Sequence, residues 1–178
     1  IVKNKILNEK KIIFVYGGSQ GSIPLIKNIL LILKNINVSH LKNIKFIIQS
    51  PKIYQNQLIK IILKLNIKFE INEFFNEIEK ILLISDLAIT RAGAGTINDL
   101  IKYKVPSIII PLPNSVNNHQ FYNASYLSNK NAAILVDEKN FNVDKNTDIF
   151  MKLIQNNKIL KNMINELNKI NLNDSNNI

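Results

Sequence analysis

Residues 85–123 read SDLAITRAGAGTINDLIKYKVPSIIIPLPNSVNNHQFYN, and this stretch predicts a complete strand–helix–strand unit. An apolar run at residues 87–90 leads into an arginine and a glycine turn, after which Thr96 is expected to open a helix. A Val-Pro pair closes the helix, and a second apolar run at 107–110 ends in a polar loop. In an open parallel sheet, ligands bind beside the carboxyl ends of the strands. The glycine turn and the polar loop are therefore expected to face a ligand.

The same alternation extends over the rest of the chain and predicts an α/β fold. Apolar runs predict further strands, and amphipathic runs predict helices between them. Strands that alternate with helices form an open parallel sheet with helices on both faces. The remaining strands are expected at 11–16, 43–49, 67–71 and 132–136, and the remaining helices at about 23–33, 53–65, 77–84, 121–129 and 151–170.

The bulk composition limits the classes of protein to which the chain can belong. Its 178 residues are 46% hydrophobic, which suits one domain with an ordinary core. The absence of cysteine excludes disulfides and cysteine-ligated metals. The formal net charge of +10 comes from scattered lysines without an arginine cluster, so a nucleic-acid partner is not expected. An anionic membrane surface fits this charge better, and an ordinary solvated surface without a charged partner fits it best. The first residue is Ile1, and the chain is interpreted as a piece of a longer protein.

The first glycine turn, GGSQGS at 17–22, lies between a predicted strand and a predicted helix. Its backbone N–H groups could face a phosphate, or its glycines could simply supply a tight turn that needs positive φ. The pattern leaves both interpretations open. Its spacing is neither the dinucleotide fingerprint nor a Walker loop.

The second glycine turn, at 91–99, has the chemistry of an anion site, because two glycines precede a helix and Arg91 lies nearby. The alternative is a capping box in which Thr96 and Asp99 merely start the helix. Taken alone, the pattern favours the cap. The polar loop contains a single histidine, His119, beside Gln120, and no spacing indicates a metal site, a nucleophile with its base, or paired carboxylates. The sequence thus predicts binding more clearly than catalysis.

Three motifs together resemble the MurG family: GGSQG at 17–21, RAGAGT at 91–96 and NHQFYNA at 118–124. These enzymes are the bacterial UDP-N-acetylglucosamine transferases that convert lipid I to lipid II in peptidoglycan synthesis. The resemblance implies a Rossmann-like domain, the carboxyl-terminal donor-binding half of a GT-B glycosyltransferase. It covers 11–170, with 1–10 as a linker from an absent amino-terminal domain and 171–178 as a frayed tail.

The resemblance also implies partners and a location. UDP-N-acetylglucosamine would be the donor, and the amino-terminal domain would bind the lipid-linked N-acetylmuramoyl-pentapeptide acceptor and supply the general base, so no catalytic residue is expected in this chain. Neither a metal nor a cofactor is required. The enzyme would lie peripherally on the cytoplasmic face of the bacterial inner membrane. A donor-binding subunit of a split transferase and a non-catalytic nucleotide-binding module are the alternatives.

The resemblance assigns donor contacts to particular residues of this chain. Asp99 would hold the ribose, Gln120 would read the donor sugar, and the backbone of Phe75 would meet the uracil. Members usually carry Glu where Asp99 stands, many have H-Q-x-G where this chain has IQSP at 48–51, and a donor-contacting arginine would precede residue 1. The complete set of UDP-N-acetylglucosamine contacts is Ser19, Phe75, Ala94, Gly95, Thr96, Ile97, Asn98, Asp99, His119, Gln120 and Asn123, with Gly17, Gly18, Gly21 and Gly93 in the diphosphate loops.

Overall fold

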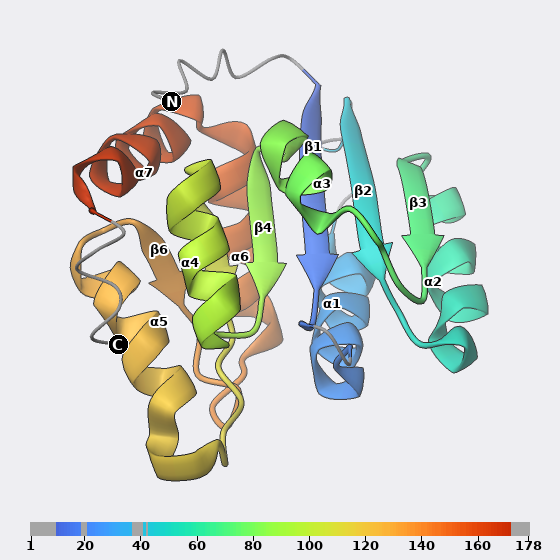
Figure 1. The fold of residues 1–178 in the computed structure, drawn as a ribbon. Coiled ribbons are helices and arrows are strands. Elements are labelled where there is room, and N and C mark those ends of the chain that lie inside the picture. Colours follow the sequence, from blue (N-terminus) through green and yellow to red (C-terminus); the bar gives the residue numbers. More distant parts are fainter. Residues whose placement is uncertain (1–9, 19–20, 37–40, 42, 172–178) are drawn as a thin grey trace.

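A computed structural model describes residues 10–18, 21–36, 41 and 43–171. Strands and helices alternate along the described chain, as Figure 1 shows. The strands are β1 (Lys11–Tyr16), β2 (Ile44–Gln49), β3 (Lys68–Asn72), β4 (Leu87–Thr90), β5 (Ser107–Ile109) and β6 (Ala133–Leu135). The helices are α1 (Ile23–Asn35), α2 (Lys52–Lys64), α3 (Ile78–Ile84), α4 (Ala94–Tyr103), the short 3-10 helix η2 (Val116–Asn118), α5 (His119–Asn129), α6 (Val143–Gln155) and α7 (Asn157–Lys169).

All six strands form one parallel sheet in the order β3-β2-β1-β4-β5-β6. The chain begins at the centre with β1, moves outward through β2 and β3, and then returns to β4 on the other side of β1. This reversal creates a switch point between β1 and β4, where Tyr16 pairs with Thr90 at the carboxyl ends of the strands. Crevices at such switch points are the usual ligand sites of open α/β sheets. The predicted α/β sheet is confirmed.

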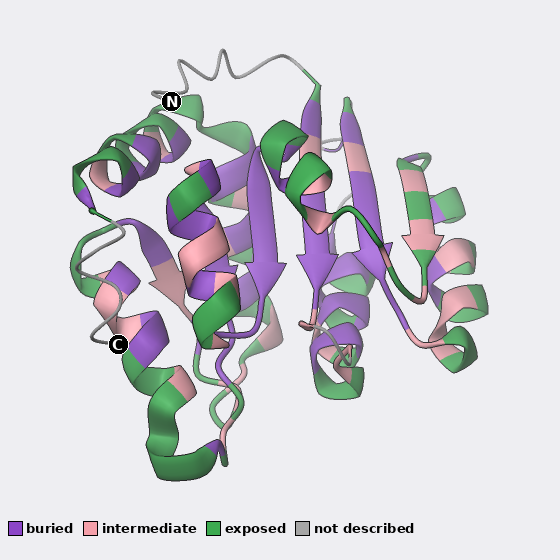
Figure 2. Ribbon diagram, viewed as in Figure 1, coloured by how far each residue is buried: buried purple, intermediate pink, exposed green. Residues whose placement is uncertain are grey.

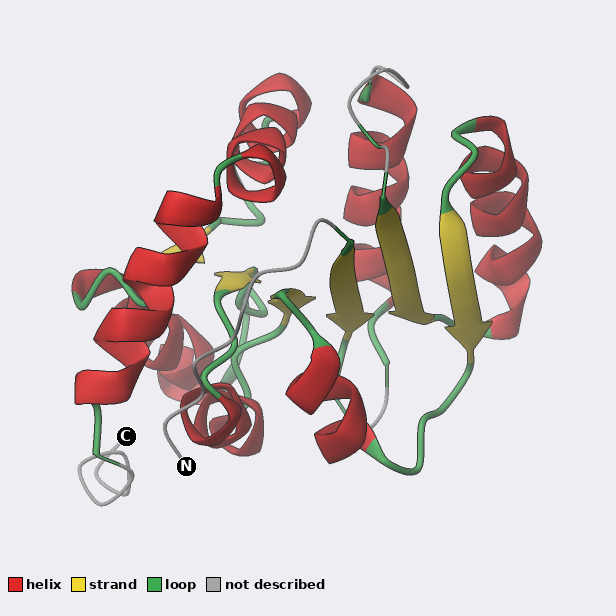
Figure 3. Cartoon of the chain, turned by 90° about the horizontal axis from the view of Figure 1, so that it is seen from above, coloured by secondary structure: helices red, strands yellow, loops and turns green. Residues whose placement is uncertain are grey.

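Helices cover both faces of the sheet (Figure 3) because successive strand residues point to opposite faces. Ile13 and Val15 of β1 belong to one buried cluster, which α1, α2 and α6 complete. Phe14 and Tyr16 belong to a second cluster, which α3, α4 and α5 complete. The central strands are buried almost throughout, as the purple ribbon in Figure 2 shows, because both of their faces are covered.

Most expected boundaries are within one or two residues of those in the structure, and three differences bear on the helices. The long helix expected at 151–170 is two helices, and Asn156 between them has extended φ and ψ and accepts a hydrogen bond from the N–H of Lys158 as the cap of α7. Helix α4 begins at Ala94 rather than at Thr96, and α5 begins at His119 rather than at Phe121. The expected linker lies outside the described residues apart from Lys10, and the expected frayed tail lies outside them apart from Asn171. No helix in the described part of the chain has the length and apolar character needed to cross a bilayer.

Candidate functional site

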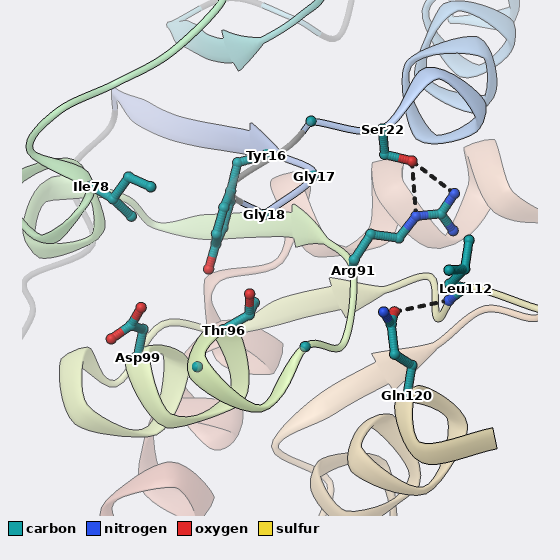
Figure 4. Close-up of a pocket in the computed structure, with 13 residues that line it drawn as sticks. Tyr16, Gly17, Gly18, Ser22, Ile78, Arg91, Thr96, Asp99, Leu112 and Gln120 are labelled. Atoms are coloured by element: carbon teal, nitrogen blue, oxygen red, sulfur yellow. Dashed lines mark hydrogen bonds between the residues drawn. The ribbon is translucent and has the colours of Figure 1, made fainter. Parts of the chain in front are cut away.

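A cavity of about 520 Å³ lies at the switch point, beside the carboxyl ends of β1 and β4. Both glycine turns, the amino-terminal part of α4 and the start of α5 contribute to its wall (Figure 4). Segments that are far apart in the sequence therefore share one cavity. Eight of the residues that the sequence analysis assigned to ligand contacts line it: Gly17, Gly18, Gly21, Gly93, Gly95, Thr96, Asp99 and Gln120.

The described glycines of the first glycine turn form hydrogen bonds within the turn and to β2. Gly18 and Gly21 have φ of 86° and 69°, and the Gly21 N–H donates to the Gly18 carbonyl at 3.1 Å. The Gly17 N–H donates to Oε1 of Gln49, at 3.3 Å. A Cβ on Gly17 would lie only 2.5 Å from the backbone nitrogen of Ser22, so this position requires glycine. Of the two interpretations that the sequence left open, the tight turn accounts for Gly17 and Gly21, whose N–H groups are bonded within the protein.

The second glycine turn leaves its helix end open. Gly93 is the N-cap residue of α4, and no side chain caps this end of the helix. The first intrahelical bond joins the Ile97 N–H to the Gly93 carbonyl at 3.0 Å, so the N–H groups of Ala94, Gly95 and Thr96 have no helical partner. Gly95 faces open space, because a Cβ built there meets no atom within 4 Å. Free N–H groups and the positive end of the helix dipole make this an anion site.

The capping box that the sequence favoured does not form. Thr96 lies inside the first turn of α4 instead of at its cap, and Asp99 lines the cavity instead of turning back to a cap amide. Burial raises the pKa of the Asp99 carboxyl, with a smaller contribution from nearby Glu79, while Lys102 opposes the shift. A partly desolvated carboxylate at the cavity wall is a good acceptor for ligand hydroxyl groups.

Arg91 is not available to bind an anion directly, in contrast to the expectation from its position. Its side chain is buried and all five of its N–H groups have protein acceptors. Nε and Nη2 donate to Oγ of Ser22 at 3.0 and 2.9 Å, Nη2 also donates to Glu138 at 3.0 Å, and Nη1 donates to the carbonyls of Ile110 and Pro111 at 2.9 and 3.4 Å. Arg91 thus joins the ends of three segments behind the cavity.

Gln120 connects the loops that follow β4 and β5. Its Oε1 accepts from the N–H of Ala92 at 3.3 Å and from the N–H of Leu112 at 3.0 Å. Because both partners are donors, the amide orientation is fixed, and Nε2 is the group left to donate to a ligand. Asn123 also contacts the loop that follows β4, since its buried Nδ2 donates to the Ala92 carbonyl at 2.9 Å.

Several other predicted contacts do not line the cavity. Ile97 is a core residue whose side chain is 1% exposed, and its N–H is used within α4. His119 is exposed, and its Nδ1 lies 2.6 Å from the Val116 carbonyl, so Nδ1 carries the proton. Phe75 lies before α3 and packs edge-on against Phe14. Ala94 and Asn98 contribute no side chain to the cavity wall, and Ser19 lies outside the described residues.

The sequence analysis missed four lining residues: Tyr16, Ser22, Ile78 and Leu112. Tyr16 is 2% exposed, and its ring stacks on Phe14 with centroids 4.4 Å apart. The hydroxyl groups of Thr90 and Thr96 are near enough to lower the pKa of Tyr16, yet none of the described residues forms a hydrogen bond of normal geometry with its Oη. Burial and the Asp99 charge outweigh them and raise that pKa well above its ordinary value, so Tyr16 is a neutral phenol in this site. The position of Tyr16 at the end of a strand, directly before the glycine turn, was the sequence signal that it lies near the cavity.

The arrangement can bind a ligand with an anionic centre and hydroxyl groups on either side. The open end of α4 suits the anion, Asp99 accepts from hydroxyls, and Gln120 donates from the opposite wall. Among the described lining residues, the titratable groups are Tyr16, Arg91 and Asp99, and of these Arg91 is already fully bonded. The cavity is therefore equipped for binding and for stabilising negative charge.

Comparison with known proteins identifies relatives over most of the chain. The family model for the glycosyltransferase family 28 C-terminal domain matches residues 12–176. UDP-N-acetylglucosamine–N-acetylmuramyl-(pentapeptide) pyrophosphoryl-undecaprenol N-acetylglucosamine transferase of Rickettsia canadensis is 39% identical over 151 residues, which is 84% of this chain and 42% of the relative. The enzyme of the same name from Rickettsia typhi is 36% identical over 155 residues, 84% of this chain and 39% of the relative. The chain thus spans about two fifths of the length of these relatives.

Solved structures share the fold at lower sequence identity. MurG of Acinetobacter baumannii superposes with a TM-score of 0.82 at 21% identity, over 98% of this chain and 52% of that one. WaaG, a glycosyltransferase involved in lipopolysaccharide biosynthesis, superposes with a TM-score of 0.65 at 14% identity, over 96% of this chain and 45% of that one. Likeness at such low identity shows the fold alone, so the reaction must be argued from the site.

Proposed function

This chain belongs to the glycosyltransferase family 28 C-terminal domain family, and from that premise we propose that it is the donor-binding half of an inverting N-acetylglucosaminyltransferase. Its donor is UDP-N-acetylglucosamine, and its acceptor is a lipid-linked N-acetylmuramoyl-pentapeptide, as the names of its relatives suggest. The donor-binding domain comprises residues 11–170. A second domain binds the acceptor and supplies the general base.

The observation that carries this proposal is the uncapped end of α4 in the same cavity as Asp99 and Gln120. The diphosphate lies at the free N–H groups of Ala94, Gly95 and Thr96. Asp99, further along α4, accepts from the ribose hydroxyls, and Nε2 of Gln120 donates to the oxygen atoms of the sugar. A sugar nucleotide has its anion between two sets of hydroxyls, and the site has matching groups in that order.

The same geometry accounts for a contribution to rate. The acceptor's C4 hydroxyl attacks the anomeric carbon, its proton passes to the base of the second domain, and UDP leaves with inverted configuration at the sugar. Negative charge on the diphosphate grows as the bond to the sugar breaks. N–H groups that are already oriented stabilise this charge more in the transition state than in the ground state, which is the condition for acceleration.

The location follows from the acceptor. A lipid-linked acceptor places the enzyme peripherally at the cytoplasmic face of the inner membrane, and the net charge of +10 favours contact with anionic lipids. Binding of this chain to vesicles that contain anionic phospholipid, compared with neutral vesicles, tests this part of the proposal. Equal binding to both kinds of vesicle would contradict it.

Calorimetry with UDP, UDP-N-acetylglucosamine and uridine tests donor binding, and reconstitution with the acceptor-binding domain tests turnover. We expect Gln120→Ala to lower the affinity for UDP-N-acetylglucosamine more than the affinity for UDP. Asp99→Ala is expected to lower both affinities. Glu70→Gln is the matched control. Glu70 lies on the edge strand β3 and forms an exposed ion pair with Lys45 of β2. Absence of binding even to the two-domain protein would refute the proposal, and binding without turnover there would indicate a non-catalytic nucleotide-binding module.

A further inference from the structure

We infer that the Ser22 hydroxyl donates a hydrogen bond to the diphosphate, and that Arg91 acts on the diphosphate through Ser22 rather than by contact. The inference rests on the proposed function and adds to it a diphosphate ligand and a positioning residue. Ser22 lines the cavity between the first glycine turn and α1. Figure 4 shows its oxygen beside the Arg91 guanidinium.

The Ser22 oxygen is fully occupied as an acceptor. It receives Nε and Nη2 of Arg91 at 3.0 and 2.9 Å, and it caps α1 by accepting from the Leu25 N–H at 3.4 Å. A hydroxyl also has one hydrogen to donate. No described residue accepts that hydrogen in the structure, and Ser22 itself lines the cavity. The hydrogen is therefore left for a ligand in the cavity.

Several backbone donors among the described residues on this side of the cavity are unavailable to a ligand. The N–H groups of Gly17 and Gly21 are already bonded within the protein. The first turn of α1 has Pro24, which has no N–H, and the Leu25 N–H is bonded to Ser22. The end of α1 thus offers few backbone donors of its own, and the Ser22 hydroxyl takes their place.

Arg91 strengthens this donor. A guanidinium that donates twice to one oxygen draws electron density from it, so the remaining O–H becomes a better donor to an anion. Glu138 fixes the guanidinium from behind, since Oε1 of Glu138 accepts from Arg91 Nη2 at 3.0 Å and from Asn28 Nδ2 at 2.8 Å. The cation is held in place before the ligand arrives, and the hydroxyl transmits its influence.

The test compares UDP with uridine on Ser22→Ala, Ser22→Thr and the unmodified chain, by calorimetry or ligand-observed NMR. Ser22→Ala is expected to lower the affinity for UDP about tenfold, because a hydrogen bond to a charged group is lost. The affinity for uridine, which has no diphosphate, is expected to stay unchanged. Ser22→Thr keeps the hydroxyl and suits the extended backbone at this cap, so it is expected to retain UDP affinity. Asn156→Ala, which removes the cap of α7 away from the cavity, controls for loss of a helix cap alone.

The outcomes separate this inference from the proposed function. If the unmodified chain binds UDP and Ser22→Ala binds it equally well, the inference is wrong while the proposed function stands. The same holds if Ser22→Ala lowers the affinity for uridine as much as the affinity for UDP. If neither the unmodified chain nor the two-domain protein binds UDP, both are wrong.

The role of Arg91 is tested by a double-mutant cycle. Arg91→Lys is expected to lower the affinity for UDP, because lysine cannot reproduce the twofold donation of the guanidinium to Ser22 Oγ. Ser22→Ala added to Arg91→Lys is then expected to lower the affinity by clearly less than about tenfold. Full additivity in a folded Arg91→Lys variant would show that Arg91 does not act through Ser22. If Arg91→Lys does not fold, Glu138→Gln replaces it: removing a negative charge behind the guanidinium is expected to maintain or raise UDP affinity, and a clear fall would contradict the inference.

Discussion

The two glycine turns of this domain look alike in sequence and are built in opposite ways. The turn at 17–22 is closed: Ser22 caps α1, Gln49 and Gly18 engage two of its N–H groups, and Arg91 holds it from behind. The turn at 91–96 is open, because no side chain caps α4 and three N–H groups remain free. The described residues of the closed turn are thus held by protein groups, whereas the open turn has N–H groups to which a ligand can bind.

The difference teaches that glycine content alone does not identify a phosphate site. At Gly17 the glycine is required by the fold, because a Cβ would collide with the backbone of Ser22. At Gly95 the surrounding space is empty, and a glycine in a helix costs stability relative to alanine. A glycine that the fold does not need, at a helix end that no side chain caps, is the stronger indication of a ligand.

The largest test of the closed turn is Arg91→Ala. Removing one partner of a buried ion pair leaves Glu138 unpaired, so we expect the free energy of unfolding to fall by about 3–5 kcal/mol. Urea unfolding followed by circular dichroism measures it. Lys45→Ala removes an exposed pair with Glu70 and should cost less than about 1 kcal/mol. Equal effects of the two substitutions would contradict the view that Arg91 organises the cavity wall.

Gly17→Ala tests whether the closed turn depends on a close approach of its backbone. The added Cβ would meet Ser22 N at 2.5 Å and Gly21 C at 2.7 Å, and such overpacking should destabilise the domain by about 1–3 kcal/mol. Gly93→Ala is the matched control in the open turn. The nearest atom to its Cβ is Thr96 Oγ1 at 3.8 Å, so its unfolding midpoint in urea should stay near that of the unmodified chain. The comparison fails if Gly93→Ala proves the more damaging of the two.

Gly95→Ala should separate stability from binding in the open turn. Alanine in place of glycine favours the helix, so the free energy of unfolding should rise by about 0.5–1 kcal/mol. The new methyl group would lie where the diphosphate approaches, so UDP affinity should fall about tenfold, or ~1.4 kcal/mol. Thermal unfolding and calorimetry on one preparation measure both changes. Unchanged UDP affinity would mean that the open helix end is not the diphosphate site.

The smallest expected effect concerns Asp99, further along the open helix. Its folded pKa is raised above the unfolded value of 3.8, so the folded state favours the protonated carboxyl. The contribution of Asp99 to stability is therefore largest below pH 3.8 and is lost as the pH rises through the folded pKa. Asp99→Asn should be slightly more stable than the unmodified chain at neutral pH, with the difference shrinking in acid. Urea unfolding at several pH values measures it, and a variant less stable at neutral pH would contradict the assignment.

Sequence reasoning could predict the layers of this fold because hydrophobic runs report burial directly. The central strands at 11–16 and 87–90 are buried on both faces, and their predicted bounds match those of β1 and β4. Helix starts were harder to place, because Thr96 and Asp99 fit a capping box that the backbone does not use. The break at Asn156 was also missed, since apolar periodicity continues through it.

The site was predictable where it depends on local motifs, and less so where it depends on tertiary contacts. The two glycine turns and Gln120 meet at one cavity, as expected. The bonds that decide the role of Arg91 join residues that lie 19 to 69 positions apart, and no local pattern encodes them. In the sequence, Tyr16 looks like an ordinary strand residue. Only the packed sheet shows that its hydroxyl is buried at the cavity wall.

The amide of Gln120 bears on any attempt to change the sugar that we propose this domain binds. Its Oε1 accepts hydrogen bonds from the loops that follow two neighbouring strands, so only its Nε2 can donate to a ligand and affect which ligand binds. Glutamate at this position would keep an oxygen that accepts from Ala92 and Leu112 but would have no N–H to donate to a ligand. Lysine would keep a donor but would lose the acceptor that joins the two loops. Redesign of donor preference would therefore do better to vary the surroundings of this side chain and to leave the side chain itself in place.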